Sequence, residues 1–241
     1  MGYDINEDVR NAQTELHQAI AALDAARANY QHGAGAAYAQ AVALQADLFA
    51  KIRAADQAAA TAESDFLREF AAAGYERNDA VREALSRKGD AVAMADAMRA
   101  ALAQREQDTR AHLIHASEQG RAYVNAHDAA QGAYARAEAY QALGEAGEKI
   151  ARAMALCSHV PQQGSAYEDS LGRMHLSEAS DAEIRAARWA FILKYLATMA
   201  KACPEYGERP VVPALGVLDL GALSARDFVS PARAQMMRKA A

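Results

Sequence analysis

Proline is missing from the first 160 residues of this 241-residue chain, and all five prolines lie between positions 161 and 231. Nothing in the first two thirds of the chain therefore forces a helix to break. Aromatic residues reach only 7%, whereas alanine makes up about a quarter of the sequence. Bulky core side chains are few and helix propensity is high. This composition predicts an all-α protein built from long, closely packed helices.

The chain also has few cysteines, no excess of positive charge and no long apolar run, and each of these limits the possible functions. The two cysteines, Cys157 and Cys203, lie far apart without a CxxC motif, which favours buried reduced thiols over a disulfide framework. The net charge is -5, with Lys and Arg spread through the helices, so we expect no direct contact with nucleic acid. No apolar run approaches the ~18 residues of a membrane span, and the first ten residues are acidic. We expect a cytoplasmic protein without a membrane partner.

Apolar and small residues recur every seven positions in the first thirty residues, a pattern typical of a helical seam. The larger series is Val9, Leu16, Leu23 and Tyr30. Alanine dominates the second series, which lets a neighbouring helix approach closely. Gly33 and Gly35 interrupt the pattern, and glycine is the usual residue where a helix ends in a left-handed conformation. We expect a turn here.

A second seam with the same spacing follows from about residue 36. It consists of Tyr38, Gln45, Ile52, Ala59 and Phe66. We expect the two segments to form an antiparallel coiled-coil hairpin, with Gln45 either setting the register or occupying a partly exposed layer. Because alanine-rich seams bury little area within one hairpin, the pattern also predicts an intertwined homodimer.

The rest of the frame is expected to stay helical. Gly74 ends the second helix, and Asn78 or Asp79 can cap a third that runs to about residue 103. Residues 104–148 are either one long helix or two broken ones, since glycines occur at four positions.

The C-terminal part differs in composition. Pro, Gln, Gly and Ser cluster in 161–170 and predict a loop. The residues from 184 to 202 are apolar on all sides, so we expect a deeply buried helix there, and 211–220 should form an extended packed arm. We therefore divide the chain into a helical frame (1–160) and a C-terminal helix with a partner-binding tail (161–241), which together form one continuous domain.

Catalytic and metal-binding patterns are sparse. His112 and His115 share one helical face with Glu118, a spacing that metal ligands use, but a solvated helix face is the simpler interpretation. The sequence contains no GxSxG, HExxH, Walker or GxGxxG motif. We expect no enzyme activity, no metal and no cofactor.

The tail gathers basic residues around one large apolar side chain, Phe228. Phe228 either docks onto the core or contacts a partner, because aromatic and arginine residues dominate interface hot spots.

Three short segments of the tail carry a resemblance to a known family. They are Glu208-Arg209-Pro210-Val211, the stretch from Ala225 through Arg226 and Phe228 to Ala232, and Met236-Met237-Arg238-Lys239-Ala240. In order and approximate spacing they resemble the end of the Psu family, the polarity suppression proteins of satellite bacteriophages. Two upstream stretches, 23–30 and 57–68, resemble the family's paired N-terminal helices. Residues 104–179 do not align, and Val229 adds one residue to the family spacing.

The resemblance implies an intertwined all-α homodimer that binds the Rho transcription termination factor, suppresses Rho-dependent termination and decorates the phage capsid. It places the Rho contact in the C-terminal region. The matched candidates are Arg209, Pro210, Arg226, Phe228, Pro231, Arg238 and Lys239. The alternative is a capsid decoration or scaffold protein on the virion, with the same dimer and no activity on Rho.

Overall fold

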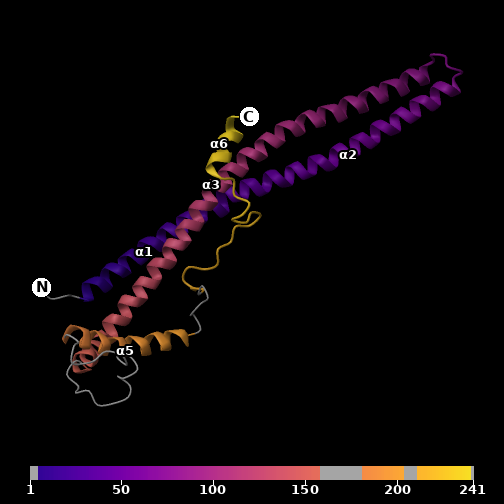
Figure 1. Cartoon of the computed structure of the whole chain (residues 1–241). Coiled ribbons are helices and arrows are strands. Elements are labelled where there is room, and N and C mark those ends of the chain that lie inside the picture. Colours follow the sequence, from indigo (N-terminus) through magenta and orange to yellow (C-terminus); the bar gives the residue numbers. More distant parts are fainter. Residues whose placement is uncertain (1–4, 158–180, 204–210, 240–241) are drawn as a thin grey trace. The chain divides into compact units, whose positions relative to one another are not determined.

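A computed structural model describes residues 5–157, 181–203 and 211–239 of the chain (Figure 1). Every regular element in these ranges is a helix, and they contain no strand. The predicted all-α class is confirmed. The chain separates into two compact units, residues 1–21 with 127–217 and residues 22–126 with 218–241. The predicted boundary at 160 and the loop at 161–170 lie outside the described residues.

The expected turn at Gly33 and Gly35 is wrong. Helix α1 (Ile5–Asn29) continues through one π-helical turn, η1 (Tyr30–Ala34), into α2 (Gly35–Ala72). Gly35 is right-handed, with φ -67°, and its N–H donates to the Tyr30 carbonyl five residues earlier. The first two segments therefore form one helical run and cannot pair with each other as a hairpin.

A one-residue slip in the seam explains the π turn. The first series keeps steps of seven up to Tyr30, but the next seam position, Tyr38, lies eight residues further. A π turn holds one more residue than an α turn, so it absorbs the slip and keeps both series on one face. Gly35 gives the turn room, because a Cβ there would lie 2.9 Å from the Tyr30 carbonyl oxygen and 3.1 Å from its ring.

The two glycines of this turn should respond in opposite ways to alanine. Gly33→Ala should raise the free energy of unfolding by about 0.5–1 kcal/mol, because Gly33 is helical and has nothing within 4 Å of an added Cβ. Gly35→Ala should lower it by about 1–2 kcal/mol through the clash with Tyr30. Urea unfolding followed by circular dichroism measures both. A stabilising Gly35→Ala would contradict the tight packing.

A Schellman motif ends α2. Gly74 has φ +66°, its N–H donates to the Ala71 carbonyl, and the Tyr75 N–H donates to the Phe70 carbonyl. The Phe70 and Tyr75 rings meet edge to face at 5.4 Å. Helix α3 (Asp79–Cys157) then begins with Asn78, whose Oδ1 accepts from the Val81 N–H at 2.9 Å. The predicted helix end and the Asn78 cap are confirmed.

Helix α2 packs beside the first part of α3 with the opposite chain direction (Figure 1). Ion pairs Glu63–Lys88 (2.8 Å) and Asp56–Arg99 (2.6 Å) join them, and Lys88 lies over the Phe66 ring. The α2 seam therefore faces α3 in place of α1. The predicted end of the third helix near residue 103 is wrong, because α3 continues without a break through 104–148.

In the other unit, the first part of α1 packs against the second part of α3. Glu15 and Arg136 form an ion pair at 3.4 Å, and a Cβ on Gly144 would touch Val9 at 3.4 Å. Small residues fill the contact: Ala12, Ala130, Ala133 and Ala137 are all buried. Alanine thus allows the close approach that the sequence predicts.

Helix α5 (Asp181–Lys201) has the predicted position, but its predicted burial is wrong. Trp189, Leu193, Leu196 and Met199 are 40%, 56%, 39% and 66% exposed. An apolar sequence indicates that a helix would gain stability from burial. Whether other elements cover it depends on the tertiary structure. Cys203, just after α5, is also exposed, so the expected burial of both thiols is wrong for this one.

Residues 211–220 are not helical, as predicted. Val212 and Leu215 are buried, while Val211 and Val217 are exposed. Among the described helices, none is both long and apolar enough to span a bilayer.

Candidate functional site

The C-terminal segment from Leu218 onwards is held against η1 and α3 within one unit. The Tyr30 hydroxyl donates to the Leu220 carbonyl at 2.7 Å, and the Gln31 side-chain amide donates to the Asp219 carbonyl at 3.3 Å. The Tyr30 ring is almost fully buried and lies 6.0 Å from the ring of Tyr123. The π turn therefore positions a tyrosine that anchors the start of the tail.

A second anchor is formed around Val229. Its N–H donates to the Ser117 Oγ at 3.0 Å, and its carbonyl accepts from the Arg121 guanidinium. Ser117 is fully buried, and its hydroxyl donates in turn to the Leu113 carbonyl at 2.7 Å. A buried hydroxyl with both its donor and its acceptor bonds made fixes the backbone at this point.

Phe228 packs over a glycine of α3. A Cβ on Gly120 would lie 2.7 Å from the Phe228 Cε1 and closer still to Cζ. Phe228 is half-buried, and Gly120 is buried. Because Gly120 has no side chain, the Phe228 ring can pack directly against the backbone of α3 at this position.

The tail also stabilises itself locally. The Asp227 carboxylate accepts from the Ser224 hydroxyl (2.7 Å) and backbone N–H (2.8 Å), and these bonds lower the pKa of Asp227. Ser230 then caps α6 (Pro231–Lys239), whose first residue is a proline, the residue best suited to that position. The segment before α6 is thus set by side-chain caps as well as by docking.

The predicted partner-binding residues fall into three groups. Arg209 and Pro210 lie outside the described residues. Arg226, Pro231 and Lys239 are exposed, and Phe228 is seated on Gly120. Arg238 is exposed and forms an ion pair with Glu118 of α3 at 2.7 Å.

The predicted seam residues are distributed between the units. Val9 and Leu16 are half-buried in the first unit, while Leu23, Tyr30 and Ile52 are buried and Phe66 is half-buried in the second. Val9, Tyr30 and Phe66 each contact α3, through Gly144, Tyr123 and Lys88 in turn.

His112 and His115 are both exposed. Across the described ranges, no group of three or more His, Cys, Asp or Glu side chains is arranged to hold a metal ion. His115 instead borders a hollow between α3 and α6.

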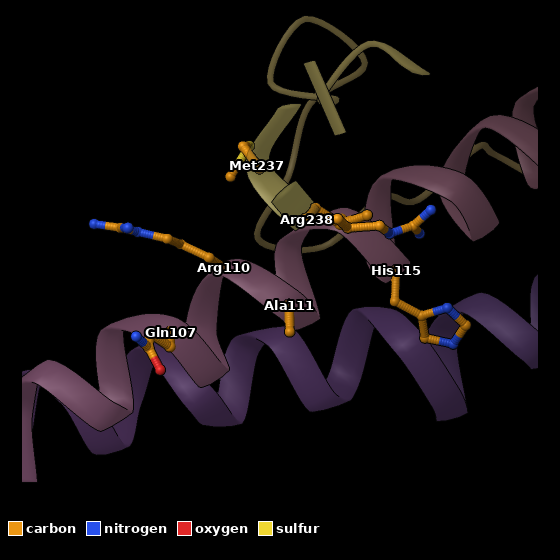
Figure 2. Close-up of a pocket in the computed structure, with 7 residues that line it drawn as sticks. Gln107, Arg110, Ala111, His115, Met237 and Arg238 are labelled. Atoms are coloured by element: carbon orange, nitrogen blue, oxygen red, sulfur yellow. The ribbon is translucent and has the colours of Figure 1, made fainter. Parts of the chain in front are cut away.

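This hollow has a volume of about 160 Å³. It is lined by Gln107, Arg110, Ala111, Ile114 and His115 of α3 and by Met237 and Arg238 of α6. In Figure 2, Met237 projects from α6 above α3, Arg110 and Gln107 lie on one side of Ala111, and His115 and the guanidinium of Arg238 lie on the other. Of these residues, only Arg238 was predicted to bind a partner. The five residues of α3 belong to the stretch 104–179, which carries no family resemblance.

Comparison with known protein families, characterised proteins and solved structures finds no match to this chain. The resemblance to the Psu family therefore depends on the short segments of the sequence alone.

The Tyr30 hydroxyl gives the tail an expected pH dependence. Burial, together with the nearby Asp219 carboxylate, raises the pKa of Tyr30 above its usual value of about 10. The folded state then holds the phenolic proton more tightly than the unfolded state. Its contribution to stability is complete below pH ~10 and is lost as the pH rises through the folded pKa.

Tyr30→Phe should therefore cost about 1 kcal/mol at pH 7, through the lost bond to Leu220, and should flatten the loss of stability above pH 10. Urea unfolding at pH 7, 9.5 and 11 measures this, with Tyr38→Phe as a matched control. An unchanged alkaline slope in Tyr30→Phe would contradict the assignment.

Proposed function

We propose that this chain is a protein-binding helical protein that inhibits the Rho transcription termination factor. The main supporting observation is the tail. Its residues from Arg226 to Lys239 carry the resemblance to the Psu family, and they are held by buried hydrogen bonds on α3 with their basic side chains exposed. A preordered surface loses little entropy on binding and suits a protein partner.

The mechanism proposed is steric. Attached to the Rho ring, the protein would hinder RNA translocation or ATP turnover while Rho keeps its own catalytic groups. The chain's net charge of -5 gives it no broad basic surface with which to compete for the RNA. Inhibition would therefore come from contact with the protein ring.

Transcription through a Rho-dependent terminator with purified components tests the proposal. Increasing amounts of the chain should raise read-through, and an Arg226→Glu/Lys239→Glu variant should need about tenfold more protein. Lys51→Glu, on the opposite side of α2 from Phe49 and with a side chain that is 61% exposed, should behave as the wild type. Unchanged termination at saturating protein, with no complex on a sizing column, would contradict it. Co-sedimentation with phage capsids, without any effect on Rho, would favour the alternative of a capsid decoration or scaffold protein.

We also propose that the working form is a homodimer. One flank of the α2–α3 pair carries four apolar side chains, Val42, Phe49, Leu85 and Val92, which are 40–44% exposed. Val42 and Phe49 precede Asp56 by 14 and 7 residues, and Leu85 and Val92 precede Arg99 by the same steps. Because seven residues make two helical turns, all four lie on the side of the Asp56–Arg99 ion pair.

This flank is self-complementary. The helices run in opposite directions, so Val42 and Phe49 lie toward one end of the flank from the ion pair, and Leu85 and Val92 toward the other. A two-fold axis through the ion pair would bring each apolar end onto the other end of a second copy and would place Asp56 near the second Arg99. Such packing would cover apolar surface and pair the charges at its centre.

A further inference from the structure

The hollow between α3 and α6 has an apolar floor. Ile114 is 5% exposed and belongs to a buried cluster with Val229 and Ala234, against which Met237 packs. Its volume of about 160 Å³ is similar to that of cavities that hold a six-carbon apolar group. One large apolar side chain of a partner would fit.

The rim of the hollow is cationic. Its ionisable side chains are Arg110, His115 and Arg238, and no carboxylate lines it. The nearest ion pairs neutralise the rim unequally: Arg238 lies 2.7 Å from Glu118, whereas Arg110 and Glu106 are 4.0 Å apart and Arg110 is 65% exposed. Arg110 extends outward from α3 in Figure 2, so its guanidinium can turn toward an incoming carboxylate at little cost.

The α6 side of the hollow is basic, although the protein as a whole is acidic. Residues 228–241 contain Arg233, Arg238 and Lys239 and no acidic residue, although the chain as a whole carries a net charge of -5. A local positive region on an acidic protein attracts an acidic partner and gives little attraction to a long polyanion. An apolar floor also has no counterpart in a phosphate backbone.

We infer that this hollow binds an acidic peptide segment of a partner protein, with one large apolar side chain seated on Ile114 and Met237 and a neighbouring carboxylate paired with Arg110. The inference deepens the proposed function, because it names the chemistry of the segment that the tail surface recognises. It assigns a binding role to Arg110, which the sequence resemblance does not reach.

The test uses the full chain and three fluorescein-labelled ten-residue peptides. The first is glutamate-rich with one central leucine, the second has alanine in place of the leucine, and the third has lysine in place of the glutamates. Fluorescence anisotropy should show binding of the first peptide, at least about tenfold weaker binding of the second, and none of the third.

Two variants of the chain locate the binding. Ala111→Phe fills the hollow from an exposed helix position and should abolish binding of the first peptide, and Arg110→Glu should weaken it about tenfold. Lys51→Glu, whose side chain on α2 is 61% exposed, is the charge-matched control and should bind as the wild type. Circular dichroism checks that each variant keeps its helix content.

Several outcomes would overturn the inference: no binding of the first peptide at millimolar concentration, equal binding of the alanine peptide, or full binding by Ala111→Phe. Tighter binding of a single-stranded RNA, lost in Ala111→Phe, would assign the hollow to nucleic acid. Since no Rho is present, the peptide test and the terminator test can fail independently. Read-through without peptide binding would support the proposed function and contradict the peptide site. Peptide binding without read-through would support the peptide site and contradict the proposed function.

Discussion

Gly120→Val is expected to lower the free energy of unfolding by about 2 kcal/mol and to loosen the tail from α3. The added side chain would enter the space of the Phe228 ring, whose Cε1 lies 2.7 Å from the Cβ position, and would also approach Tyr30 at 3.1 Å. The ring cannot simply move aside. The next residue, Val229, is fixed by its bonds to Ser117 and Arg121.

A double-mutant cycle separates this clash from a general effect on the helix. In a Phe228→Ala background, Gly120→Val should cost close to nothing, because the space is empty and valine suits a helix no worse than glycine. Gly89→Val, on the same helix where nothing lies within 4 Å of an added Cβ, should stay within about 0.5 kcal/mol of the wild type. Urea unfolding gives the energies, and limited proteolysis between Gly221 and Ser230 reports tail release. An equal cost of Gly120→Val with and without Phe228 would show that the ring is not the cause.

Local signals in the sequence were sufficient for the helix class and for several helix ends. The Asn78 cap of α3 and the end of α2 at Gly74 could be predicted, because each depends on residues within about one helical turn. The pairing of the helices was mispredicted at Gly33 and Gly35. Glycine is compatible with a turn and with a helix, and the deciding signal was the eight-residue step from Tyr30 to Tyr38, which a π turn absorbs.

The site was less accessible to sequence reasoning, because its contacts join residues far apart in the chain. Ser117 bonds to Val229 across 112 residues, and Gly120 serves as a seat only for a ring that arrives from position 228. A serine and a glycine within a long polar helix carry no local mark of these roles. Likewise, the residues that line the hollow beside His115 become neighbours of Arg238 only when α6 folds back onto α3.

Replacing Phe49 and Val92 together by glutamate is expected to convert the proposed dimer to a monomer and to raise its dissociation constant at least about 100-fold. Both side chains lie on the flank marked by the Asp56–Arg99 ion pair, and a two-fold contact would bury two new carboxylates from each copy without partners. Each helix should keep its fold, because the two positions are 44% and 41% exposed in the single chain. Light scattering across a concentration series measures the change, with circular dichroism as the check on helix content.

The opposite flank offers a matched control. Leu44 and Met94 lie two residues beyond Val42 and Val92, which is about 200° around each helix, and they are 43% and 57% exposed. Leu44→Glu with Met94→Glu adds the same charge to the same helices and should leave the dimer intact. A wild-type chain that is monomeric at micromolar concentration would contradict the dimer itself. If both double variants dissociated the dimer equally, the choice of flank would be contradicted. Dimerisation would then not depend on the side of α2 and α3 that carries the Asp56–Arg99 ion pair.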